Sequence, residues 1–163
     1  MADERPGGKA LLIGGMVLLG LLFFYRNSGI GGQAPDFTLP ETYGGDVSLA
    51  SYRGHRVLLV FWTTSCGICR RELPILSNMA PELMKEGVSV VAIHLGQDDV
   101  RGYLRSNGVD LVSLVDADGT VGRAYHVSAV PRLVLVGEDG KVERSGTGMT
   151  DEGTLREWCG AGA

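Results

Sequence analysis

Apolar residues in the first half of this chain form runs that predict a hairpin, a buried strand and a long helix. Between Pro35 and Leu49, alternating apolar residues surround a glycine-containing turn, which is typical of a β-hairpin. The unbroken apolar run 57–62 predicts a strand with both faces buried in a sheet. The stretch 66–85 carries apolar residues at mostly helical spacing, and we expect its two prolines to kink or interrupt this helix.

The second half of the chain repeats the strand-then-helix unit and closes with a hairpin and a helix. Strands are expected at 88–95, 111–115, 133–136 and 142–144, and helical segments at 98–106, 121–125 and 150–158. Alternating strands and helices that end in a hairpin and a helix predict the α/β class, with a mixed sheet covered on both faces.

The N-terminus carries a different pattern, a uniformly apolar and uncharged stretch from Ala10 to Tyr25 between basic residues. It is shorter than the roughly 20 residues that span a bilayer as a helix, but Lys9 and Arg26 can snorkel and lengthen it. A cleaved signal segment is the alternative. The residues after Phe24 lack the small-x-small site that signal peptidase prefers, which favours an uncleaved anchor.

These patterns divide the chain into an N-terminal cytoplasmic tip (1–9), a transmembrane anchor or signal segment (10–26), a flexible glycine-containing linker (27–34) and a globular domain (35–163). More basic residues precede the apolar stretch than follow it, which favours a domain outside the cytoplasm. The 163-residue chain has 15 Lys and Arg against 19 Asp and Glu, a net charge of -4, and no basic stripe. This balance argues against a nucleic-acid partner.

Cys66 and Cys69 stand where the buried strand gives way to the helix. Residues three apart in a helix share a face, with Cα atoms about 5 to 6 Å apart, and this separation suits a disulfide. Thr64 and Ser65 are N-cap candidates. Because Cys66 lies nearer the unpaired N–H groups and positive dipole end of the helix, we expect it to be the nucleophile and Cys69 the resolving cysteine.

Two other uses of the cysteine pair fit less well. A zinc site needs four ligands, and no second knuckle at metal spacing is present. A structural bridge over four residues restrains the unfolded chain little. Cys159 is a free thiol, an intermolecular partner or a packed small residue, and His126 could approach the site but is more typical of a surface group. No metal or cofactor is expected beyond the redox-active disulfide.

The run from Phe61 to Pro74 resembles the active-site segment of the TlpA/ResA/DsbE-like thioredoxins, which are membrane-anchored, extracytoplasmic disulfide reductases. The resemblance extends to 34–39 and 124–131 and covers nearly all of residues 34–158. It implies a thioredoxin-like mixed sheet flanked by helices, with an N-terminal β-hairpin and an N-terminal transmembrane anchor.

The same resemblance implies roles for four further residues. Pro131 would be a cis proline beside the cysteine pair, and the Val130 backbone would pair with an extended substrate. Trp62 would belong to the substrate-binding surface, and Glu72 would tune the cysteine pKa values. Ser65, Ile68 and Arg132 depart from the common pattern, which leaves the reduction potential and the preferred client open.

The leading hypothesis is therefore thiol-disulfide exchange with protein substrates in the periplasm or at the cell exterior. By resemblance the protein would act as a reductant in cytochrome c maturation, with apocytochrome c as client and a membrane electron-donor thiol protein as partner. A peroxiredoxin-like thiol peroxidase is one alternative, because 35–37 and Thr63-x-x-Cys66 are similar to that class, although its proline before the threonine is missing. A copper-binding chaperone that uses the two thiols is the other.

Overall fold

A computed structural model describes residues 31–160 of the chain. The predicted cytoplasmic tip, the predicted anchor and the first residues of the predicted linker lie outside the described residues. Within 31–160, no helix combines the length and the apolar character needed to cross a membrane.

The core of the domain is a five-stranded mixed sheet in the order β5-β4-β3-β6-β7. Strand β3 (Arg56–Trp62) is central, parallel to β4 (Val88–Leu95) and antiparallel to β6 (Arg132–Val136). The edges are β5 (Val112–Asp116), parallel to β4, and β7 (Val142–Thr147), antiparallel to β6. The central strand and the terminal hairpin predicted from the apolar pattern are confirmed.

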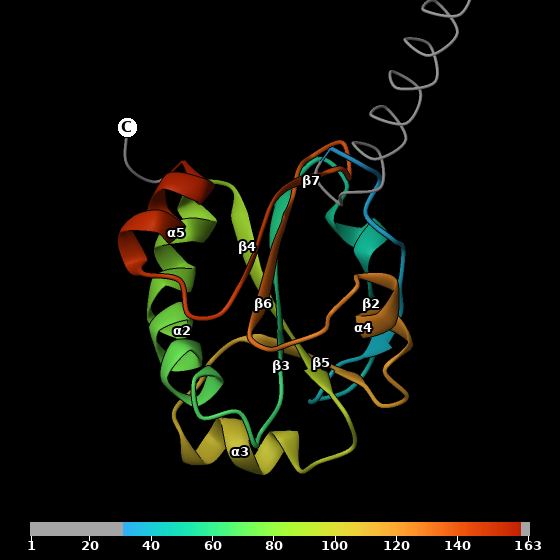
Figure 1. Ribbon diagram of the computed structural model, residues 1–163, viewed down its shortest axis with the longest axis vertical. Helices are drawn as coiled ribbons and strands as arrows, with labels where there is room; N and C mark the ends of the chain where they lie inside the picture. The colour runs from blue at the N-terminus through green and yellow to red at the C-terminus, as the bar shows by residue number, and fades with distance from the viewer. Residues whose placement is uncertain (1–30, 161–163) are drawn as a thin grey trace, which may run out of the picture.

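Both faces of the sheet are covered, which explains the unbroken apolar run in β3. Its alternate residues point to two separate core clusters, one on each face. One cluster includes residues of α2 (Cys69–Lys85), α3 (Val100–Ser106) and α5 (Glu152–Cys159). The other includes residues of β1 (Thr38–Pro40), the 3-10 helix η1 (Leu49–Tyr52) and α4 (Thr120–Ala124). The hairpin partner β2 (Asp46–Ser48) pairs antiparallel with β1, as predicted. Figure 1 shows α2 and α5 on one side of the sheet and β2 and α4 on the other.

Helix α2 runs through both of its prolines, so Pro81 neither ends nor restarts it. Each proline removes one backbone hydrogen bond from the helix interior. The buried side chains of Leu73, Leu76 and Leu83 hold the helix against the sheet. Tertiary packing therefore overrides the local preference for a break.

The end of the predicted linker belongs to the folded domain, which corrects the boundary at residue 35. The backbone N–H of Gly31 donates to the Val142 carbonyl over 2.7 Å, and that of Ala34 donates to the Gly140 carbonyl over 2.9 Å. Ala34 is buried. A glycine-rich composition predicts a flexible tether, but here these backbone groups pair with the turn and second strand of the β6–β7 hairpin.

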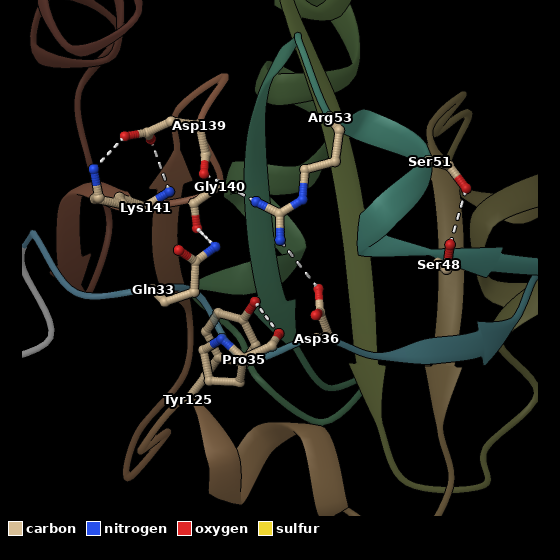
Figure 2. A network of polar contacts seen from close by, with 10 residues as sticks. All are labelled: Gln33, Pro35, Asp36, Ser48, Ser51, Arg53, Tyr125, Asp139, Gly140 and Lys141. Carbon is tan, nitrogen blue, oxygen red and sulfur yellow. Dashed lines mark hydrogen bonds and ion pairs between the residues drawn. The ribbon is translucent and has the colours of Figure 1, made fainter.

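Side chains reinforce this attachment, as Figure 2 shows. The Gln33 amide donates to the Gly140 carbonyl, and the Tyr125 hydroxyl donates to the Pro35 carbonyl. The Arg53 guanidinium donates to the Asp139 carbonyl and lies 3.6 Å from the Asp36 carboxylate. The start of the domain is thus anchored to the hairpin turn and to the loop after α4.

Candidate active site

The two cysteines predicted to react are joined in a disulfide, with their Cα atoms 5.3 Å apart. Cys66 lies in the loop after β3, and Cys69 is the first residue of α2. The Cys69 side chain is fully buried, whereas Cys66 is half-buried. Cys66 is therefore the sulfur that a second protein can reach.

Backbone groups at the start of α2 surround Cys66. The Cys69 N–H donates to Cys66 Sγ over 3.1 Å, and the Arg70 N–H donates to the Cys66 carbonyl over 3.1 Å. The predicted N-caps Thr64 and Ser65 are wrong, because the helix starts later and its cap position, Ile68, makes no side-chain bond. A sulfur that accepts from a helix N–H at the positive dipole end is stabilised as a thiolate.

The loop before β6 approaches the same sulfur. The peptide bond between Val130 and Pro131 is cis, as the resemblance implies. Cys66 Sγ lies 3.7 Å from the Val130 carbonyl oxygen, and the Gly148 N–H donates to the Pro131 carbonyl over 2.8 Å. The fold thus brings together residues that lie 64 positions apart in the sequence.

Glu72 is buried, with only 1% of its surface exposed, three residues after the buried Cys69. Its Oε1 accepts a hydrogen bond of 2.9 Å from the Thr150 N–H, and its Oε2 has no hydrogen-bond partner within residues 31–160. Burial raises the pKa of this carboxyl, and the bond from Thr150 opposes that rise. A carboxyl with a raised pKa and one free oxygen takes up a proton at a higher pH than an exposed glutamate does.

Replacing Glu72 with glutamine tests this burial through stability. The ordinary pKa of the carboxyl is 4.5 and the folded value is higher, so the folded protein keeps a proton that the unfolded chain has lost. The wild-type free energy of unfolding therefore falls as pH rises upward from 4.5 through the folded pKa. Urea unfolding of oxidised Glu72→Gln and wild type should show a difference that grows in the variant's favour over that window. A pH-independent difference would contradict the raised pKa.

Trp62, which the resemblance placed at the substrate surface, is fully buried. Its indole packs against the rings of His94 and Tyr103, with centroids 4.9 and 5.1 Å apart. A side chain without exposed surface does not contact a client in this state. We therefore assign Trp62 to the packing beneath the active-site loop.

From the sequence, no functional role was assigned to His94 or Asp98, and Thr64 was named only as a helix cap. His94 lies opposite Trp62 in the parallel register of β3 and β4 and is fully buried. Its Nε2 is 3.4 Å from Asp98 Oδ2, and the same oxygen accepts a hydrogen bond from the Thr64 hydroxyl. The signal available in the sequence was a histidine inside an apolar strand with an aspartate four residues later.

Three other residues noted in the sequence lie outside the group formed by His94, Asp98 and Thr64. Cys159 is buried on α5, and burial raises the pKa of its thiol. His126 is exposed, with a φ of 52°. The guanidinium of Arg132 donates to the Thr147 and Ser145 hydroxyls of β7. Among the described residues, no three His, Cys, Asp or Glu side chains gather as metal ligands would.

This chain is similar to a known protein family and to a thiol-disulfide oxidoreductase. The AhpC/TSA family model matches residues 30–145. The thiol-disulfide oxidoreductase ResA of Bacillus subtilis (strain 168) is 33% identical over 130 residues, which cover 78% of this chain and 73% of ResA.

Solved structures show the same similarity. A crystal structure from Chlorobium tepidum, assigned as a thiol:disulfide interchange protein DsbE, is 30% identical with a TM-score of 0.75, covering 81% of this chain and 96% of the other. A secreted Mycobacterium tuberculosis disulfide oxidoreductase homologous to E. coli DsbE is 27% identical with a TM-score of 0.65, covering 77% and 95% of the two chains.

Proposed function

We propose, from the premise that this chain belongs to the AhpC/TSA family and is a ResA-like thiol-disulfide oxidoreductase, that Cys66 attacks client disulfides and Cys69 resolves the mixed disulfide. The observation that carries this assignment is the asymmetry of the pair. Cys66 is half-buried and accepts a helix N–H at its sulfur, whereas Cys69 is fully buried. The accessible, thiolate-favouring sulfur meets the client first.

The exchange then runs in two balanced steps. The reduced Cys66 thiolate attacks one sulfur of a client disulfide, a bond forms between Cys66 and the client, and the other client sulfur leaves as a thiolate that takes up a proton. The Cys69 thiolate next attacks Cys66 Sγ and displaces the client's remaining sulfur, which is protonated in turn. Two electrons pass to the client, and the protein ends in the Cys66–Cys69 disulfide seen here.

Substrate contact and pKa control fall to the residues around the sulfur. The Val130 backbone, beside the cis proline, would pair with an extended client segment that presents its cysteine to Cys66. Glu72 would tune the cysteines, because its ionised form disfavours a nearby thiolate and its protonated form does not. The raised pKa of Glu72 supports this, since it places the change of charge closer to neutral pH.

We place the domain outside the cytoplasm, attached to the membrane through residues 10–26, where a membrane electron-donor thiol protein would reduce it. The apolar stretch and its flanking charges support this location, as does the similarity to a secreted oxidoreductase. The client we favour is apocytochrome c, whose Cys-x-x-Cys-His must be reduced before haem attachment. The similarity to ResA and to DsbE-type proteins supports that choice.

Replacing Cys69 with alanine tests client, direction and location together. Without the resolving thiol, Cys66 should remain in mixed disulfides that survive acid quenching and alkylation in intact cells. We expect adducts with extracytoplasmic proteins, apocytochrome c among them, and with the electron donor. The matched control is the Cys66→Ser/Cys69→Ala double variant, which should form no adducts. Adducts confined to cytoplasmic proteins would overturn the location.

The two alternative activities have separate tests. A thiol peroxidase would consume peroxide rapidly at Cys66 without a protein disulfide, and a copper chaperone would bind Cu(I) stoichiometrically through the two thiols. Peroxide consumption faster than disulfide exchange, or stoichiometric copper binding without exchange, would favour the corresponding alternative.

A further inference from the structure

His94 is a polar residue in an apolar site directly beneath the active-site loop. It is 0% exposed, and within residues 31–160 neither ring nitrogen makes a hydrogen bond of good geometry, the neighbouring Asp98 carboxylate oxygen being 3.4 Å from Nε2. Leaving a buried polar atom without a partner costs stability, so such an atom calls for an explanation. A leucine or valine would suit this position in β4 better if packing were the only requirement.

The ionic neighbour of His94 is shared with the active-site loop. Asp98 Oδ2 lies 3.4 Å from His94 Nε2 and also accepts a hydrogen bond from the Thr64 hydroxyl. Thr64 is two residues before Cys66, in a loop closed by the Cys66 N–H donating to the Thr63 carbonyl over 3.2 Å. The Asp98 side chain is 55% exposed, which leaves it room to shift between its two neighbours.

Asp98 is one of several groups near the His94 ring. Titratable groups on the neighbouring elements include Asp98 on the β4–α3 loop, Tyr103 on α3, whose ring packs on Trp62, and Cys69, Arg70 and Glu72 in the first turn of α2. From β3 it meets the Trp62 ring, and its partner on β5 is the apolar Val115. Asp98 is the charged group that acts on the imidazole.

We propose that His94 is a positioning residue for the active-site loop: its protonated ring competes with the Thr64 hydroxyl for the Asp98 carboxylate and thereby makes exchange at Cys66 depend on pH. This inference rests on the proposed function, because it assigns regulation to the same site. A neutral ring leaves the carboxylate to Thr64. A protonated ring offers a charge-assisted hydrogen bond, roughly twice as strong as a neutral one, and draws Asp98 away from the loop.

The surroundings of the His94 ring determine the direction in which its pKa is shifted. Burial lowers the pKa of His94 below its ordinary value of 6.5, and Asp98 partly opposes this shift. The ring is therefore neutral at pH 7, and the loop is held through Thr64. Protonation of the ring, which takes place below its ordinary pKa of 6.5, releases the loop.

Thermodynamic linkage provides a test that does not depend on activity. If protonation of His94 weakens the bond between Asp98 and Thr64, removal of the Thr64 hydroxyl must strengthen proton binding by His94. In Thr64→Val we expect about threefold tighter proton binding, a His94 pKa rise of about half a unit, measured by NMR titration of the three histidines. Asp98→Asn should lower the same pKa. The matched control is Thr63→Val, whose hydroxyl faces Ser65 and should leave it unchanged.

The second arm measures the exchange reaction. The rate constant for reduction of an oxidised peptide by the reduced full chain should show an inflection at the NMR-determined pKa of His94. Asp98→Asn and His94→Asn should lose that inflection, whereas His126→Asn, on the exposed surface, should keep it. Because Asp98 is half-exposed, its variant tests the proposal even if His94→Asn does not fold.

The outcomes distinguish the role of His94 from disulfide exchange at Cys66. An unchanged His94 pKa in Thr64→Val, or an inflection that persists in Asp98→Asn, would overturn the role of His94 while leaving exchange at Cys66 intact. A wild-type protein that does not exchange disulfides would overturn the proposed function, and the NMR arm would still decide whether His94 and Thr64 are coupled.

Discussion

Replacing Cys66 with serine is expected to lower the rate of protein-disulfide reduction by about 10³-fold or more, the largest effect on activity of any single change considered. A hydroxyl at this position cannot form a mixed disulfide. Cys69 is fully buried and cannot take over the attack, and Cys159 is buried on a different helix. The measurement is insulin or apocytochrome peptide reduction by the reduced, full-length protein.

The matched control is Cys159→Ser, which removes a cysteine of similar burial outside the active site. Its exchange rate should stay close to that of the wild type. Activity retained by Cys66→Ser would assign the attack to another group, and activity lost in Cys159→Ser would show that the third thiol takes part.

Trp62→Ala is expected to cause the largest loss of stability, about 3 to 5 kcal/mol of unfolding free energy, as for other large-to-small changes of buried aromatics. The indole is fully buried between His94 and Tyr103 at the end of the central strand. Its removal leaves a cavity beneath the active-site loop. Urea unfolding of the oxidised protein measures the change.

The other tryptophan of the chain provides the control. Trp158 on α5 is only partly buried, so Trp158→Ala should cost clearly less. Trp62→Phe, which keeps an apolar ring, should retain most of the exchange activity at reduced stability. A Trp62→Phe variant with wild-type stability but a much weakened interaction with clients would restore the substrate-binding role that the buried position argues against.

Local regularities explain which elements could be predicted. The strand β4 and the apolar run of β3 follow from side-chain alternation and burial, and the Cys66–Cys69 distance follows from helix geometry over three residues. The linker end and Trp62 depended instead on partners far away in the sequence. Gly31 pairs with Val142, and Trp62 packs on a histidine 32 positions later. No local pattern records such a partner.

By itself, the sequence determined the α/β class, the order of strands and helices, and the pair of cysteines that can open and close a disulfide, because each depends on residues close together in the chain. Only the tertiary structure decided that Glu72 is buried against the Thr150 N–H and that Asp98 lies between His94 and the active-site loop. Burial and charge at these positions arise from contacts between segments that meet only when the sheet and its covering helices assemble.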